Sequence, residues 1–156
     1  MPDVFNKRKR SKVMAAIRSS GNKATELKLV EIFRLYGIKG WQRKRRLVGK
    51  PDFIFPKERM AIFVDGCFWH GCRFHCRMPK SRLTYWTPKI IRNRRRDAEI
   101  GKQLRKLGWR VLRIWEHSLK NPERIAIRLH AMLGNAPQNR LNVAKDVNAS
   151  THSAKI

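Results

Sequence analysis

Two carboxylates stand at the ends of a predicted β-hairpin. Asp52 begins one strand and Asp65 ends its partner, with a turn expected near residues 57 and 58. In that register residue 63 lies opposite Asp52, so Asp65 is a diagonal neighbour on the same face, roughly 7 Å away or less. Two carboxylates at that separation can hold one hard cation such as Mg²⁺, which would activate water for phosphodiester cleavage. The alternative is a pair of solvated acids at strand ends.

Two further acids occupy predicted helices. Glu26 lies at the edge of an apolar stripe. Asp97 is seven residues from both Ile90 and Leu104, so it projects from the apolar face of a long helix, with Asn93 one turn before it. A carboxylate on an inward face is unfavourable unless it is paired, so both acids could support the catalytic site. The alternative is an ion pair with a neighbouring arginine: Arg92, Arg94, Arg95 or Arg96.

A segment rich in cysteine and histidine follows the hairpin and reads Cys-Phe-Trp-His-Gly-Cys-Arg-Phe-His-Cys. Cys67, Cys72 and His75 have metal-binding spacings, with Cys76 as an alternative ligand. Tetrahedral zinc needs a fourth ligand, and His117, at the end of a predicted strand, is the best candidate. A closed site of this kind is structural. Free thiols in a loop are the alternative.

His70 and two aromatic residues lie inside that segment. His70 comes five residues after Asp65 and could act as general acid or base; a surface histidine or a further zinc ligand is the alternative. Phe68 and Trp69 precede it, and Trp86 lies at the start of the long helix. Aromatic rings in a basic setting can wedge between DNA bases. Taken alone, these rings are more typical of a cover for the core or for the zinc site.

The elements that must position these residues follow from periodicity and turn residues. Apolar spacings of three and four predict helices, and short apolar runs bounded by Gly or Pro predict strands. We expect helices over 11–19 and 24–36, strands over 41–48, 52–55 and 60–64, a loop over 66–80, a helix over 83–107, a strand over 109–115 and a helix from 122 to about 133. This order favours an α/β fold with a small mixed sheet flanked by helices.

The composition of the chain indicates its class of partner and its cellular compartment. The chain has 156 residues, with 37 Lys and Arg against 11 Asp and Glu, for a formal charge of +26. This excess favours nucleic acid as the partner over a ribosomal-type or merely solubilising basic surface. No run approaches the roughly 20 apolar residues of a membrane span, and no apolar stretch follows the basic start as in a secretory signal. We expect a cytoplasmic protein, in which three clustered cysteines favour metal over disulfide.

Taken together, these motifs resemble the very-short-patch repair (Vsr) DNA mismatch endonucleases. The resemblance covers about residues 8 to 133 and is carried by Arg-Ser-Lys-Val-Met-Ala-Ala-Ile from 10, Gly-Lys-Pro-Asp-Phe from 49, Phe-Val-Asp-Gly-Cys-Phe-Trp-His-Gly-Cys from 63, Met-Pro-Lys-Ser from 78, Tyr-Trp from 85, Asn93, Arg-Asp from 96 and Gly-Trp-Arg-Val-Leu-Arg-Ile-Trp-Glu from 108. It implies a restriction-endonuclease-like fold, a mixed central sheet flanked by helices with a structural zinc site. It also implies a strand-specific nick on the 5′ side of the thymine in a T:G mismatch formed by deamination of 5-methylcytosine.

The resemblance implies roles for the catalytic residues. Asp52 would bind the catalytic Mg²⁺ with help from the Val64 carbonyl, and His70 would be the catalytic histidine. Glu26 and Asp97 match supporting acidic positions. The fold family's usual Glu-x-Lys pair is absent.

The same resemblance implies roles around the aromatic rings and the zinc. Phe68, Trp69 and Trp86 match rings that wedge into DNA beside the mismatch, and Asn93 matches a position at the same DNA interface. The resemblance therefore favours DNA binding for these rings over a cover for the core. The zinc positions are matched by Cys67, Cys72, His75 and His117. The last of these stands where a cysteine is expected, a swap that zinc tolerates. Asp65 stands where some members have a histidine, so its role is open between metal ligand and base.

The domain organisation and partners complete these expectations. We expect a flexible basic arm over 1–10, one endonuclease domain over 11–134 and a disordered tail over 135–156. The resemblance implies a bacterial, nucleoid-associated monomer that acts on double-stranded DNA, with a companion cytosine methyltransferase. The rival hypotheses are a zinc-stabilised DNA-binding module without catalysis and a generic restriction-type nuclease on the same fold.

Overall fold

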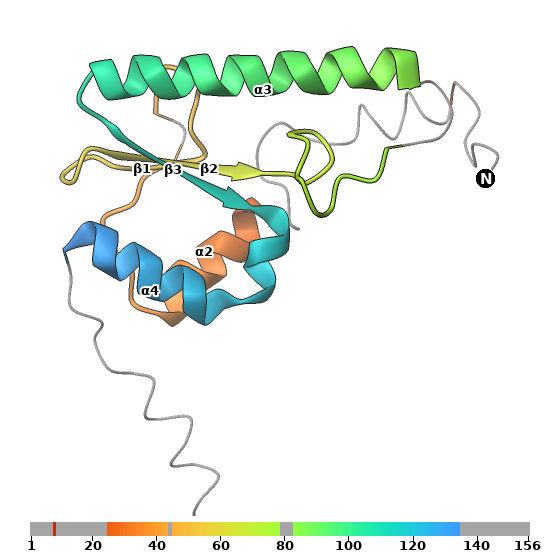
Figure 1. Ribbon diagram of the computed structural model, residues 1–156. Coiled ribbons are helices and arrows are strands. Elements are labelled where there is room, and N and C mark those ends of the chain that lie inside the picture. Colours follow the sequence, from red (N-terminus) through yellow and green to blue (C-terminus); the bar gives the residue numbers. More distant parts are fainter. Residues whose placement is uncertain (1–7, 9–24, 44, 79–82, 135–156) are drawn as a thin grey trace, which may run out of the picture.

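The computed structural model describes Arg8 and residues 25–43, 45–78 and 83–134. Its elements are α2 (Glu26–Leu35), β1 (Phe53–Phe55), β2 (Met60–Asp65), α3 (Leu83–Lys106), β3 (Arg110–Trp115), the 3₁₀ helix η1 (Glu116–Lys120) and α4 (Pro122–Leu133) (Figure 1). The predicted helix over 11–19, the tail over 135–156 and all of the basic arm except Arg8 lie outside the described residues.

The three strands form one mixed sheet in the order β1-β2-β3. β1 and β2 are antiparallel, with Phe53 opposite Ile62, whereas β2 and β3 are parallel. The antiparallel register confirms the predicted hairpin, because one further step places residue 63 opposite Asp52. The parallel pair needs a crossover, and α3 supplies it. The chain is therefore mixed α/β, as the order of its elements predicts.

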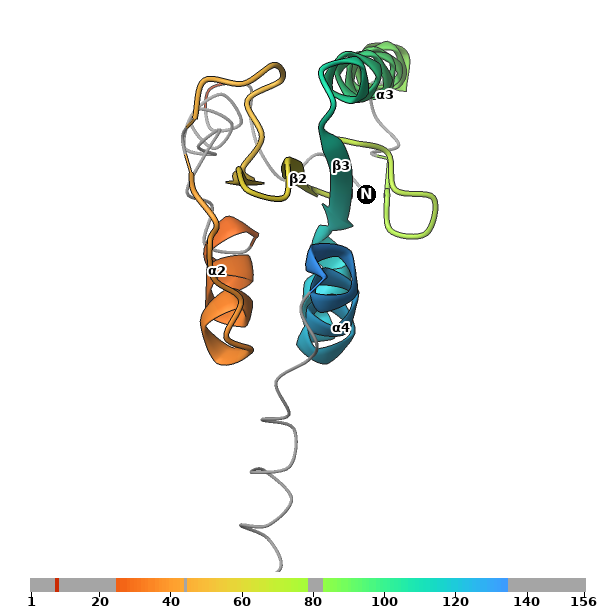
Figure 2. The same cartoon turned by 90° about the vertical axis from the view of Figure 1, so that its left-hand side faces the viewer.

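Helices cover both faces of the sheet. α3 crosses one face, and α2 and α4 cover the other (Figures 1 and 2). On the α2–α4 side, Phe33 and Leu129 pack with the strand residues Phe53, Ile62 and Leu112. The smaller core on the α3 side is formed by Ile54, Ala61, Phe63 and Leu104. Because side chains alternate along a strand, each strand residue faces either α3 or the α2–α4 layer.

The strand predicted over 41–48 is wrong. Only Gln42 pairs in a sheet-like manner, through an isolated bridge to Ile54. The four consecutive basic residues that follow cannot present an alternating apolar face to a core, so the segment does not extend the sheet. Leu47 and Val48 instead pack against the core on the α3 side.

The remaining helices and strands begin and end within two residues of the predicted positions. The ends of α4 follow local signals: Asn121 accepts a hydrogen bond from Arg124 N at 3.2 Å, Pro122 is the first residue, and Gly134 is a left-handed cap. The sequence did not predict η1, which continues directly from β3. None of the helices in the described ranges is both long and apolar enough to cross a membrane.

Candidate active site and metal centre

An open pocket of about 940 Å³ lies on the α3 side of the sheet. It is lined by all of the acids and the histidine predicted for the catalytic site: Glu26, Asp52, Asp65, His70 and Asp97. Basic side chains line much of the rest: Arg43, Arg45, Arg46, Lys50, Arg96 and Arg113. A group of acids surrounded by cations can hold a metal ion and attract a phosphodiester at the same place.

The hairpin carries Asp52 and Asp65 to this pocket. Ile54 and Phe63 belong to the α3-side core, and two-residue alternation puts both carboxylates on the same side. Asp52 Oδ2 accepts a hydrogen bond from Val64 N at 2.7 Å. This bond fixes the Asp52 carboxylate against the neighbouring strand.

The environment of Asp52 disfavours its ionised form. Burial raises its pKa from 3.8 to about 6. The hydrogen bond from Val64 opposes this shift, the carboxylates of Glu26 and Asp65 add to it, and Arg43 lowers it. A divalent cation beside Asp52 would reverse the balance, because an adjacent positive charge favours a carboxylate.

α3 supplies the partner of His70. The stripe of Ile90, Gly101 and Leu104 is buried against the rest of the protein, and Asp97 lies on the same face by helical spacing. Asp97 Oδ2 is 2.5 Å from His70 Nδ1. The inward placement of Asp97 agrees with its spacing, but its observed partners come from the loop and from β3 and not from the neighbouring arginines of its own helix. Because Nδ1 is held, Nε2 is the ring nitrogen left for proton transfer.

Arg113 is a member of the site that the sequence alone did not single out. Its Nη1 lies 2.7 Å from both oxygens of Asp65, which is only 3% exposed, and its Nη2 lies 3.3 Å from Asp97 Oδ1. The guanidinium also lies 4.7 Å from the centre of the Phe63 ring. Arg113 is the register partner of Phe63 and shares its face of the sheet, but this parallel register is visible only in the folded chain.

Glu26 reaches the pocket from the opposite helical layer. It is the first residue of α2, is 4% exposed and forms an ion pair with Arg43. The Arg43 guanidinium also lies 5.5 Å from the centre of the Phe53 ring. Glu26 is therefore a buried, paired acid next to Asp52, as a supporting role requires.

Four ligand atoms from the segment after β2 and from η1 lie within 4.8 Å of one another. They belong to Cys67, Cys72, His75 and His117. His117 Nδ1 is 3.2 Å from Cys67 Sγ and 3.6 Å from Cys72 Sγ, and His75 Nδ1 is 3.6 Å from Cys72 Sγ. Ligands of a tetrahedral zinc with Zn–S near 2.3 Å and Zn–N near 2.0 Å are roughly 3.3–3.8 Å apart, so this donor set fits such an ion.

The pKa shifts of Cys67 and His117 also favour a bound cation. Burial raises the pKa of the Cys67 thiol, and the neighbouring Cys72 adds to the shift. Loss of hydration lowers the pKa of His117, with a further contribution from His75. A neutral imidazole is the form that binds metal, and a metal would stabilise the thiolates that the protein alone disfavours.

Cys76 lies outside this four-residue group. Its Sγ contacts the Phe68 carbonyl at 3.7 Å, while its backbone N–H donates to the Cys72 carbonyl at 3.0 Å. Of the two ligands weighed at this end of the segment, His75 is therefore the one that the structure brings to the cluster.

Gly71 holds the segment close to α3. Its φ is +63°, and a Cβ at this position would lie 2.7 Å from Ile90 Cγ2. The left-handed backbone favours glycine, and the close approach to Ile90 leaves little room for a Cβ. This contact places His70, the preceding residue, next to Asp97.

The aromatic residues predicted to contact DNA form one cluster beside the Cys/His group. Ring centres of Phe68, Trp69 and Trp86 are 5.2 to 5.9 Å apart, and Trp86 is 8% exposed. Lys89 Nζ lies 5.3 Å from the Trp69 ring centre and 5.4 Å from that of Trp86. The rings therefore pack on one another and carry a cation at their side.

Asn93 connects this cluster to α3. Its Nδ2 donates a hydrogen bond to the Trp69 carbonyl at 2.9 Å. The side chain thus fixes the backbone of the aromatic segment, a contact that the sequence did not predict for a residue expected at the DNA.

Comparisons with known proteins identify the family of the chain. The family profile described as "DNA mismatch endonuclease Vsr" matches residues 2–77. The chain is 38% identical over 128 residues to the DNA mismatch endonuclease Vsr of Escherichia coli (strain K12), covering 80% of each chain. It is 37% identical over 135 residues to the type II nicking enzyme V.XorIIP of Xanthomonas oryzae pv. oryzae, covering 85% of this chain and 98% of the relative.

A third relative, the type II nicking enzyme V.NaeI of Lentzea aerocolonigenes, is 39% identical over 116 residues, covering 69% of this chain and 68% of the relative. Matches of this identity and coverage extend through the hairpin, the Cys/His segment and α3. The chain belongs to the Vsr family of DNA mismatch endonucleases.

Proposed function

We propose that this protein is a Mg²⁺-dependent endonuclease that nicks one strand of DNA on the 5′ side of the thymine in a T:G mismatch. The observation that carries the proposal is that Asp52 and the His70–Asp97 pair line one pocket with basic walls. A carboxylate for a cation beside an oriented proton carrier is what phosphodiester hydrolysis requires. The names of the relatives, a mismatch endonuclease and nicking enzymes, support the substrate and the single-strand cut.

Asp52 and the Val64 carbonyl would hold the cation. In an extended strand the N–H and C=O of one residue point to the same side, and the Val64 N–H points at Asp52. Carboxylate and carbonyl oxygens suit Mg²⁺, which keeps other positions for water and phosphate. When bound, the ion would activate water and neutralise charge that develops on the phosphate.

His70 would transfer the proton. The Asp97 carboxylate accepts the Nδ1 proton, which selects one tautomer and orients the ring. Nε2 is then available to take a proton from water or to give one to the leaving oxygen. Asp65 and Glu26 would act through other groups, since each is occupied by an arginine.

Zn²⁺ held by Cys67, Cys72, His75 and His117 would have a structural role. All four positions of a tetrahedral ion are then filled by protein, which leaves none for substrate. His117 follows β3 directly, so the zinc would tie the segment after β2 to the end of β3. Phe68, Trp69 and His70 lie within the segment fixed in this way.

Phe68, Trp69 and Trp86 would wedge into the DNA beside the mismatch. Their cluster packs two rings of the Cys/His segment against Trp86 of α3, and Lys89 adds positive charge at its side. Insertion of rings between base steps is easier where a mismatch weakens stacking. Asn93 would contribute to this DNA interface by holding the Trp69 backbone.

The proposal also covers the fold, the cellular location and the partners of the enzyme. The mixed sheet between helical layers supports a restriction-endonuclease-like fold for a single domain over 11–134. A cytoplasmic, nucleoid-associated bacterial monomer with a companion cytosine methyltransferase fits the family.

The test is cleavage of end-labelled duplexes that differ only in one base pair, T:G or T:A. Wild-type protein with Mg²⁺ should cut the thymine strand of the T:G duplex and leave the other strand intact. Binding to the T:G duplex without any product would favour a zinc-stabilised DNA-binding module. Cuts in both strands of the T:A duplex would favour a generic restriction-type nuclease. Either result overturns the proposal.

A further inference from the structure

His70 has two carboxylates within reach and one of them is much closer. Its Nδ1 is 2.5 Å from Asp97 Oδ2 and 3.9 Å from Asp65 Oδ1. A neutral imidazole has one N–H to donate at Nδ1, so the two acids compete for it. The choice matters, because the accepting carboxylate sets the direction in which Nε2 points.

Arg113 contacts both competitors in different ways. Its Nη1 is 2.7 Å from each oxygen of Asp65, so neither oxygen is free of the guanidinium. Its Nη2 is 3.3 Å from Asp97 Oδ1 only, which leaves Oδ2 for the histidine. We call these contacts among Arg113, Asp65 and Asp97 the Arg113 bridge.

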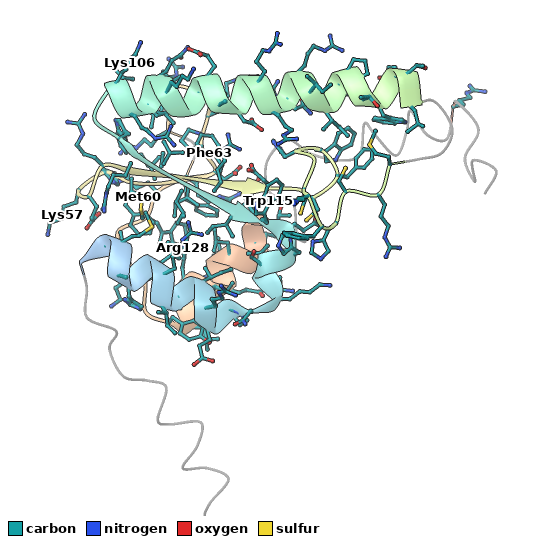
Figure 3. All side chains as sticks on the ribbon, viewed as in Figure 1. Lys57, Met60, Phe63, Lys106, Trp115 and Arg128 are labelled. Atoms are coloured by element: carbon teal, nitrogen blue, oxygen red, sulfur yellow. The ribbon has the colours of Figure 1, made fainter. Side chains whose placement is uncertain are left out.

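The guanidinium of Arg113 also contacts the Phe63 ring. Arg113 and Phe63 are register partners on β3 and β2, and the guanidinium carbon lies 4.7 Å from the centre of the Phe63 ring. A planar cation that lies over a ring and contacts carboxylates on β2 and α3 keeps its fork in one orientation. Figure 3 shows Phe63 pointing toward α3, the helix that carries Asp97.

The residues of the Arg113 bridge line two open spaces. Asp65, His70, Asp97 and Arg113 line the main pocket and also a second cavity of about 540 Å³ beside β3 and α3. In the described part of the chain, Arg113 and His70 are the basic side chains within 4.0 Å of Asp65. Without Arg113, His70 would be the nearest hydrogen-bond donor among these side chains to a carboxylate that is 3% exposed.

We propose that Arg113 is a positioning residue that assigns His70 to Asp97 by keeping both oxygens of Asp65 occupied. The inference rests on the proposed function for its effect on cleavage. It explains how Asp65 and Asp97 share a pocket with one histidine without exchanging partners. It also predicts that loss of Arg113 slows cleavage because Asp65 then competes for His70, and not because a positive charge is missing.

The decisive experiment is a set of single-turnover nicking rates at saturating protein. Arg113→Met should reduce the rate about 10- to 100-fold, as expected when the orientation of a catalytic group is lost. Adding Asp65→Asn to Arg113→Met should raise the rate again about tenfold, because the released competitor is removed. Arg113→Lys, which keeps the charge but cannot span two carboxylates, should fall between wild type and Arg113→Met.

A matched control removes an arginine from the same strand. Arg110 is exposed on β3 and donates to the Met132 carbonyl. Arg110→Met removes the same charge and should retain nearly the wild-type rate. If the Asp65→Asn/Arg113→Met protein is as slow as Arg113→Met or slower, the proposal is overturned, because Asp65 would then act directly at the cation or the substrate.

A second readout does not depend on cleavage. In ¹⁵N spectra of the histidine rings, the Nδ1 signal of His70 should shift in Arg113→Met and return toward its wild-type position in the double variant. Wild-type protein that fails to nick T:G DNA contradicts the proposed function but leaves this spectral test intact. A His70 signal that does not respond to Arg113→Met contradicts the Arg113 bridge even if wild type cleaves.

Discussion

The pocket proposed to be catalytic and the Cys/His group lie next to each other, but different parts of the fold position their residues. In the pocket, Asp52 and Asp65 are placed by a hairpin whose register fixes the face of every residue. In the Cys/His group, the ligands come from a segment without helices or strands and from η1. The sheet therefore positions the two carboxylates of the first site without any ion, whereas the second site would depend on the proposed zinc ion to hold its chain segments together.

This difference teaches what each metal would contribute. A cation at Asp52 would relieve an ionisation that burial disfavours, so its binding serves chemistry. A zinc ion at Cys67 and His117 would join two distant segments, so its binding energy is folding energy. Variants in the pocket should therefore lower mainly the nicking rate, and variants in the Cys/His group should lower mainly the stability of the fold.

The largest expected effect is loss of cleavage in Asp52→Ala. Removing a ligand of the catalytic cation should lower the nicking rate on the order of a thousandfold. The thermal midpoint should stay the same or rise, because the ionised Asp52 is disfavoured in the fold. Glu58→Ala, in the turn between β1 and β2, is the control and should cleave normally. A midpoint that falls together with activity would mean that Asp52 is structural.

Next in size is the loss of stability in Cys72→Ser. Removing one ligand of a structural zinc should cost about 3 kcal/mol or more, which is a fall of roughly 10 °C in the thermal midpoint. Cys76→Ser alters the thiol that lies outside the cluster and should leave both the midpoint and the zinc content unchanged. Metal analysis of the purified proteins should give about one zinc per chain for wild type. Equal losses in both variants would remove the zinc assignment.

A smaller effect is expected from pH. The pKa of Asp52 is raised in the fold from 3.8 to about 6, so its contribution to stability is present below the ordinary value and is lost as pH rises through about 6. Mg²⁺ must displace the proton, so its affinity should fall about tenfold per pH unit below about 6 and level off above it. Titration calorimetry near pH 5, 6 and 7.5 measures this, and a pH-independent affinity would exclude Asp52 as the ligand.

The smallest effect distinguishes backbone strain from packing. Gly71 and Gly37 have nearly the same φ, +63° and +64°, but only Gly71 has α3 in the path of a Cβ. Gly37→Ala should cost about 1 kcal/mol from the backbone alone. Gly71→Ala should cost more and should also slow nicking severalfold, because it displaces His70 from α3. Denaturant unfolding and nicking rates of the two variants make the comparison, and identical results would leave Gly71 without a positioning role.

The sequence predicted most where periodicity applies. The hairpin around Asp52 and Asp65 followed from two-residue alternation, and the inward face of Asp97 followed from helical spacing. The strand over 41–48 failed because the four basic residues at 43–46 leave no alternating apolar face between its apolar ends. Isolated pairing at Gln42 needs a partner strand, which no local pattern reveals.

Contacts between distant segments were less predictable. The pairing of Asp97 with His70 joins α3 to a loop, and the pairing of Asp65 with Arg113 joins two strands separated by α3. Such pairs depend on tertiary packing, so a single sequence indicates only that each acid needs some partner. The Cys/His group was easier, because three of its ligands are local and only His117 is distant.

The most direct test of two separate centres uses zinc-loaded, magnesium-free protein and a T:G duplex labelled at the 5′ end of the thymine strand. The account predicts a stable protein that binds this duplex without cutting it and, after Mg²⁺ is added, one product that ends immediately 5′ of the thymine. Cleavage at full rate before Mg²⁺ is added, or no cleavage afterwards, would contradict the division of duties between the two sites.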